Sequence, residues 1–86
     1  MAVFDKKKYK WYEYNHAQPF TLTRRGGDVK LHNGMRYGVR DATSPTAANY
    51  GMSRLVVKGY PISHVFTIFP SDVKLLMNRS KRIRQQ

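Results

Sequence analysis

The stretch that decides the fold is GGDVKLHNGMRYGVR, residues 26–40. Asn33 and Gly34 at its centre are a strong signal for a β-hairpin turn, because glycine adopts the left-handed backbone conformation at little steric cost. A two-residue loop would place apolar side chains and arginines on the same face of the hairpin. A three-residue loop instead pairs Lys30 with Arg36 and gathers the apolar side chains on the other face. We therefore expect the three-residue loop, because the apolar pattern selects the register.

The predicted hairpin has one apolar face and one cationic face. The apolar face is formed by Val29, Leu31, Met35, Tyr37 and Val39. The cationic face carries Lys30 and Arg36 opposite each other, with Arg40 further along the strand. Like charges that face each other across paired strands cost stability, up to roughly 1 kcal/mol. We expect an anionic partner to neutralise them.

The rest of the chain is predicted to form short strands followed by one helix. Strands are favoured by aromatic and β-branched side chains within residues 4–15, 20–23, 55–58 and 62–69. Ser71 and Asp72 favour the start of a helix, which is predicted to run to about Arg84. We therefore expect a mainly β fold, a small antiparallel five-stranded barrel of the SH3-like or OB-like kind, with one C-terminal helix.

Basic side chains are concentrated toward the two ends of the chain. In total, 16 Lys and Arg residues against 5 Asp and Glu residues give a formal net charge of +11. Residues 41–78 are nearly neutral, whereas residues 79–86 carry basic side chains and no acidic one. We expect a basic N-terminal arm over residues 1–10, a single small β-rich domain over residues 11–78, and a basic C-terminal extension of the helix over residues 79–86. Such asymmetry indicates an electrostatic partner.

The sequence offers no recognisable catalytic, cofactor or metal site. It has no cysteine, and His16, His32 and His64 have no partner at metal-ligand spacing. Gly26 and Gly27 are not followed by the Gly-Lys-Ser or Gly-Lys-Thr of a phosphate-binding loop. We therefore expect a protein that is not an enzyme and that needs no cofactor or metal.

The hydropathy pattern gives no sign of a membrane segment. No apolar run approaches the roughly 18 residues that a membrane span needs. The N-terminal lysines are not followed by the apolar segment of a secretory signal. We therefore expect a cytoplasmic or virion-associated protein with no membrane partner.

The leading hypothesis is nucleic-acid binding without sequence preference. Lys and Arg neutralise phosphates and release counterions, and exposed aromatic side chains stack on unpaired bases, each worth about 1–3 kcal/mol. The candidate binding residues are the basic side chains of the arm, a loop, the hairpin and the C-terminal segment, with two aromatic side chains: Lys6, Lys7, Lys8, Lys10, Trp11, Tyr12, Arg24, Arg25, Lys30, Arg36, Arg40, Arg79, Lys81, Arg82 and Arg84. The sequence does not distinguish DNA from RNA, or single from double strands.

These features also have structural explanations, and a second hypothesis stays open. Trp11 suits the core of a small β domain, and arginines near a helix C-terminus stabilise its dipole by about 0.3–1 kcal/mol each. The same cations would suit a docking component of a large assembly, such as a phage virion or ribosome-associated protein. They would equally suit a small phage inhibitor that docks on an acidic surface of a host enzyme. Edge strands such as residues 20–23 offer a route to homo-oligomers.

Overall fold

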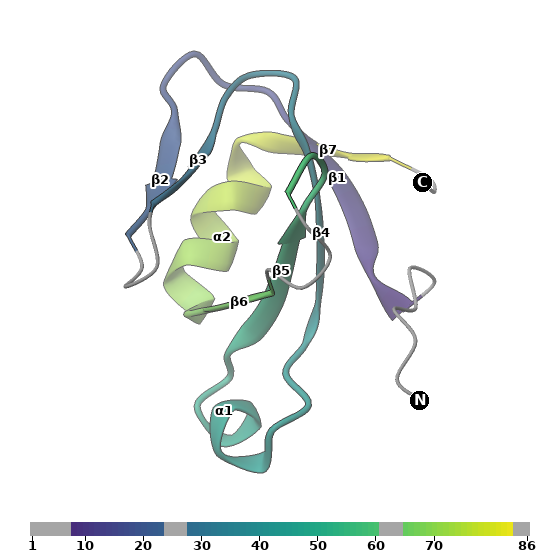
Figure 1. Ribbon diagram of the computed structural model, residues 1–86, viewed down its shortest axis with the longest axis vertical. Helices are drawn as coiled ribbons and strands as arrows, with labels where there is room; N and C mark the ends of the chain where they lie inside the picture. The colour runs from purple at the N-terminus through teal and green to yellow at the C-terminus, as the bar shows by residue number, and fades with distance from the viewer. Residues whose placement is uncertain (1–7, 24–27, 61–64, 84–86) are drawn as a thin grey trace.

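The computed structural model describes residues 8–23, 28–60 and 65–83. Within these ranges the chain is mainly β, as predicted, with seven strands and two short helices (Figure 1). The strands are β1 (Lys10–Tyr14), β2 (Phe20–Leu22), β3 (Val29–Leu31), β4 (Arg36–Asp41), β5 (Ser53–Val57), β6 (Phe66–Ile68) and β7 (Ser80–Ile83). The helices are α1 (Pro45–Asn49) and α2 (Pro70–Asn78).

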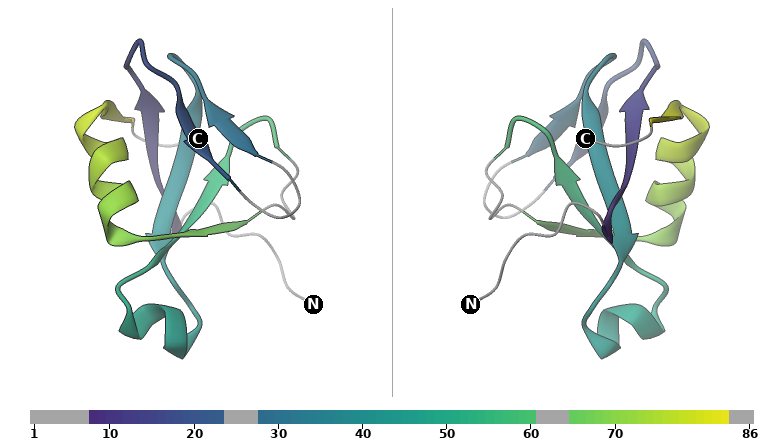
Figure 2. Two further views of the ribbon diagram at one scale, coloured as in Figure 1. Left: turned by 90° about the vertical axis from the view of Figure 1, so that its left-hand side faces the viewer. Right: turned by 90° about the vertical axis from the view of Figure 1, so that its right-hand side faces the viewer.

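The strands form one large and one small sheet. Five strands make an antiparallel sheet in the order β6-β5-β4-β1-β7, and β2 and β3 make a separate two-stranded sheet. Figure 1 shows α2 and the β2–β3 pair on the same side of the large sheet, which we call its inner face. We call the opposite side the outer face. The large sheet ends at β6 and β7, so it is not closed into a barrel. The loop that carries α1 projects beyond the sheet (Figure 2).

The turn at Gly34 forms, with a φ of 93°, but the predicted pairing of its two arms is wrong. β3 pairs with β2, so that Lys30 lies opposite Thr21. Arg36 begins β4, which belongs to the large sheet, and lies opposite Glu13 of β1. The predicted pair of like charges, Lys30 and Arg36, therefore does not exist. The cationic hairpin face is wrong in that form.

Contacts with β1 separate the two arms of the turn. The Tyr14 N–H donates to the Met35 carbonyl at 2.8 Å, and the Gly34 N–H donates to the Tyr14 carbonyl at 2.7 Å. The Met35 N–H still closes the turn by donating to the His32 carbonyl at 3.0 Å, but the two hydrogen bonds with Tyr14 go to β1, and among the described strands β3 does not pair with β4. The apolar side chains of β3 and β4 still reach one core, so the apolar pattern suits both arrangements equally well.

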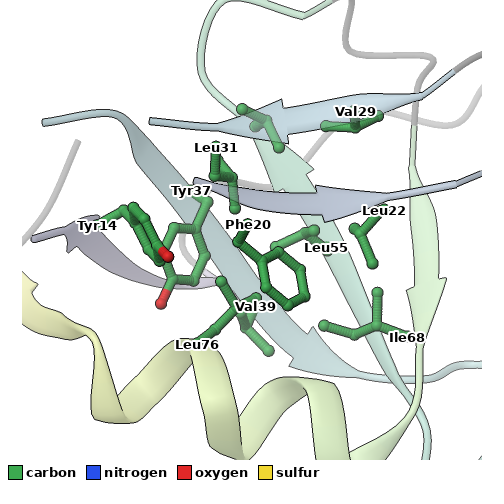
Figure 3. Close-up of a cluster of buried hydrophobic side chains, with 11 residues drawn as sticks. Tyr14, Phe20, Leu22, Val29, Leu31, Tyr37, Val39, Leu55, Ile68 and Leu76 are labelled. Carbon is green, nitrogen blue, oxygen red and sulfur yellow. The ribbon is translucent and has the colours of Figure 1, made fainter. Parts of the chain in front are cut away.

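The main core lies between the inner face of the large sheet, α2 and the β2–β3 pair (Figure 3). Its largest fully buried side chains are Tyr14, Leu31, Tyr37, Leu55, Ile68 and Leu76. Burying one large apolar side chain contributes about 1.5–3 kcal/mol. Because these residues come from three layers, their burial holds α2 and the small sheet against the large one.

Tyr37 joins several elements inside this core. Its ring stacks on Tyr12, with ring centroids 5.6 Å apart and planes inclined by 19°. Its hydroxyl donates to Ser80 Oγ at 2.7 Å, and the Ser80 hydroxyl donates to the Leu76 carbonyl at 2.6 Å. A buried phenol without a partner would cost about 1–3 kcal/mol. These hydrogen bonds therefore stabilise the junction between α2 and β7 against β4.

The helix ends at Asn78, so the prediction that it continues to about Arg84 as a basic extension is wrong. The segment Ser80–Ile83 instead forms β7 and pairs with β1. The Arg79 carbonyl already accepts a hydrogen bond from the Asn15 N–H at 2.7 Å. Hydrogen bonds to the backbone edge of β1 thus compete with the hydrogen bonds that would continue the helix beyond Asn78.

A smaller apolar cluster lies on the outer face. Tyr9, Trp11 and Val56 are buried there. Trp11 packs over Gly38, where an added Cβ would lie 3.1 Å from Trp11 Cε2 and 3.1 Å from Tyr9 Cβ. The explanation of Trp11 as a core residue is therefore confirmed, because the residue is 7% exposed and offers no open surface for a base.

We predict that Gly38→Val lowers the free energy of unfolding by about 1–3 kcal/mol, because the new side chain overpacks against Trp11. Urea denaturation measures the loss. The same change made in a Trp11→Leu background should cost less, since the smaller side chain leaves room. Equal costs in the two backgrounds would show that the Trp11 contact is not the constraint.

We also predict that Tyr37 makes stability fall at alkaline pH. Burial raises the pKa of the Tyr37 phenol from 10.0 to about 12, with the hydrogen bond to Ser80 opposing the shift. Both states are protonated below about pH 10, so no effect is expected there. Between about pH 10 and 12 only the unfolded phenol ionises, so this group lowers the free energy of unfolding by about 1.4 kcal/mol per pH unit.

Denaturation at a series of pH values measures this slope. Tyr37→Phe should flatten it, whereas Tyr50→Phe should leave it unchanged because Tyr50 is 71% exposed. An unchanged slope in Tyr37→Phe would contradict the assignment.

Candidate nucleic-acid interface

Strand pairing gathers basic side chains on the outer face of the large sheet. Val39 and Leu55 are paired and lie in the main core. Because successive side chains of a strand point to opposite faces, the next pair, Arg40 and Arg54, points outward. Arg36 lies on the same face of β4, on the other side of Gly38. Two arginines are therefore directly opposite each other on neighbouring strands, with a third nearby.

Few carboxylates balance this charge. Among the strand residues that the structure describes, Glu13 is the one carboxylate on the outer face, between Arg36 of β4 and Lys81 of β7. We call the four basic side chains that the strand register places on this face the outer-face cations: Arg36, Arg40, Arg54 and Lys81. Lys58 follows β5 directly, and its N–H donates to the Arg36 carbonyl at 3.0 Å.

Neighbouring side chains hold Arg40 and Arg54 in place. The guanidinium carbon of Arg40 lies 5.8 Å from the centroid of the Tyr9 ring. Arg54 Nη1 donates to Thr43 Oγ1 at 3.0 Å. Neither contact neutralises the positive charge. The two guanidinium groups are thus positioned in part by neutral groups and keep hydrogen-bond donors for an anion.

A groove of about 500 Å³ lies between β1 and α2. Three basic residues line it, Lys8, Lys10 and Arg40, together with the acidic residue Asp41. The rest of the lining is apolar or weakly polar: Tyr12, Val39, Ser53, Val73 and Met77. Arg40 belongs to the lining of the groove and to the outer-face cations, and its guanidinium group lies over Tyr9 on the outer face, so Arg40 marks the boundary between the two basic regions.

Tyr12 is a rigid part of the groove wall. It stacks on Tyr37, and the guanidinium carbon of Arg82 lies 5.6 Å from the centroid of its ring. Arg82 lies opposite Tyr12 in the pairing of β7 with β1. This arrangement adds a further cation beside the groove.

The structure places the remaining predicted residues elsewhere. Lys30 is exposed on β3, in the small sheet. Arg79 is a structural residue: its Nη1 donates to the Tyr14 hydroxyl at 3.0 Å and its Nη2 to Gln18 Oε1 at 3.5 Å. The predicted residues that lie outside the described part of the chain are Lys6, Lys7, Arg24, Arg25 and Arg84.

Sequence reasoning missed Arg54, which lies opposite Arg40. Arg54 precedes the apolar run Leu55–Val57, and its alternation with Leu55 indicates an outward side chain. The position of Arg54 beside Arg40 depends on the pairing of β4 with β5, which no local pattern specifies. Asp41 and Met77 were missed for the same reason, since the groove forms only when α2 packs beside β1.

No protein family, curated protein or solved structure matches this chain at a significant level. The assignment of a function therefore depends on the side chains and their geometry.

The described residues hold neither a metal-binding cluster nor a membrane-spanning helix. No group of three His, Cys, Asp or Glu side chains within them is arranged to hold a metal ion. None of the helices in the same part of the chain is long and apolar enough to cross a membrane.

Proposed function

We propose that this chain is a non-enzymatic nucleic-acid-binding protein whose contacts are mainly with phosphates and independent of sequence. The observation that carries the proposal is the pairing of Arg40 with Arg54 on the outer face of the large sheet. Directly opposed side chains have Cβ atoms about 4.5–5.5 Å apart. The charges lie at the ends of these side chains, with the Arg40 guanidinium over Tyr9 and the Arg54 guanidinium bonded to Thr43, so the strand pairing brings two cations that repel each other onto one patch.

An anion that binds between the two arginines turns this repulsion into attraction. Each guanidinium binds a phosphate through two parallel hydrogen bonds, and a row of phosphates suits a row of cations. Arg36 and Lys81 extend the row on the outer face, and Lys8 and Lys10 extend it into the groove. Counterion release from the nucleic acid would supply most of the affinity.

The large sheet of the described residues is open, so a likeness to SH3-like or OB-like barrels stays a prediction. Small antiparallel β domains of the OB type bind oligonucleotides on one face of a curved sheet. A cytoplasmic or virion-associated location likewise stays a proposal.

A second candidate is a docking component of a large assembly, or an inhibitor that binds an acidic protein surface. One observation favours it: Tyr50, Phe69 and Leu75 are large apolar side chains exposed by 71%, 57% and 38%. Exposed apolar side chains of this size suit a protein partner better than a polyanion.

We predict that the double variant Arg40→Gln with Arg54→Gln binds an oligonucleotide about tenfold more weakly. The slope of log affinity against log salt should fall by about 1–2, because each lost phosphate contact removes about 0.7–0.9 from it. Fluorescence anisotropy at several salt concentrations measures both quantities. Thermal stability should hold or rise, since the repulsion between the arginines is removed.

The matched control is Lys30→Gln with Lys74→Gln, which removes the same charge from exposed positions on β3 and α2. This control should keep most of the affinity and the slope. Equal losses of affinity in the two double variants would mean that net charge alone attracts the oligonucleotide. A collapse of stability in the arginine variant would mean that the Arg40 and Arg54 side chains are structural. Absence of saturable binding by the unchanged protein, with co-purification of a defined protein, would favour the docking candidate.

A further inference from the structure

We propose that the groove between β1 and α2 holds one unpaired nucleotide, so that the protein prefers single-stranded over double-stranded nucleic acid. This inference rests on the proposed function and names the form of nucleic acid that it binds. The groove volume of about 500 Å³ lies within the 300–1,000 Å³ of typical small-ligand pockets.

The groove carries charges of both signs, which restricts the kind of molecule that can bind in it. Lys8 and Lys10 attract an anion, whereas Asp41 repels one. A simple polyanion that filled the groove would therefore meet a carboxylate at one place. A nucleotide avoids this conflict, because it joins an anionic phosphate to a neutral base. Aspartate accepts hydrogen bonds from the exocyclic amino group of a base such as cytosine.

The apolar lining suits the flat faces of a base. Val39, Val73 and Met77 contribute apolar surface, and the thioether of methionine makes favourable contacts with aromatic rings. Tyr12 is held by its stack on Tyr37 and by Arg82 before any ligand arrives. A wall that is already ordered lowers the entropic cost of binding.

Base pairing would exclude a nucleotide from the groove. In a duplex each base is stacked and paired, so it would have to leave the helix before it could contact Met77 or Asp41. The outer-face cations contact phosphates of either form. The groove therefore adds affinity for single strands alone.

The direct test compares Met77→Gln with Leu75→Gln. Both changes place the same polar side chain on α2, but Met77 lines the groove whereas Leu75 does not. Anisotropy is measured with a 12-nucleotide single strand rich in cytosine and with the duplex of the same sequence. We expect Met77→Gln to weaken single-strand binding about fivefold and to leave duplex binding unchanged, and we expect Leu75→Gln to change neither.

A second variant tests the carboxylate. Asp41→Ala should strengthen binding of oligo(dT), because the repulsion of phosphate is removed, and should abolish any preference for oligo(dC) over oligo(dT). If Met77→Gln does not fold, photo-crosslinking of the unchanged protein to a single strand that carries 5-iodocytosine replaces it. Crosslinks should then fall on Tyr12 or Met77.

Each outcome is decisive. Equal affinity for single strand and duplex, equal effects of the two α2 variants, or crosslinks confined to the outer face would overturn the inference and leave the proposed function in place. Failure to bind either form would overturn both. Binding of an acidic peptide in the groove, with no oligonucleotide binding, would identify a protein partner instead and would also overturn both.

Discussion

The buried phenol of Tyr37 is the contact on which the arrangement of the large sheet depends. It lies in the centre of the core, stacks on Tyr12 and donates to Ser80, which in turn donates to the carbonyl of Leu76. This chain of contacts stabilises the end of α2 and the start of β7 against β4. Because β7 then pairs with β1, Lys81 lies on the outer face and Arg82 lies beside Tyr12. One satisfied polar group in the core thus helps to position two cations of the candidate interface.

The two faces of the large sheet carry different kinds of side chain. The inner face carries the apolar side chains and is covered by α2 and the β2–β3 pair. The outer face carries a small cluster around Trp11 and Gly38, and beyond it the opposed Arg40 and Arg54. The burial of apolar surface explains which side chains lie on the inner face and in the Trp11 cluster. Arg40 and Arg54 are only partly buried, and their opposed like charges cost stability, so their presence is the feature on which the proposed polyanionic partner rests.

Local patterns predicted the β class and the turn at Gly34, because apolar alternation and turn chemistry are encoded in adjacent residues. They did not predict which strands pair. Lys30 was expected opposite Arg36, yet the backbone of Tyr14 binds the turn and separates β3 from β4. The position of Arg54 beside Arg40 is equally nonlocal, because it follows from the pairing of β4 with β5. The cationic character of the site was therefore predictable, whereas the residues that form it required the sheet order.

The central claim is that an oligonucleotide binds across the outer face and the adjoining groove. The most direct measurement is a nuclear magnetic resonance titration of the ¹⁵N-labelled protein with a single-stranded oligonucleotide at low salt. The account predicts that the largest shifts of backbone and guanidinium signals cluster on β4, β5 and the start of β1, around Arg40, Arg54 and Lys10, with little change at Lys30. Shifts centred on the β2–β3 pair or on the loop around Tyr50, or no saturable shifts at all, would contradict it.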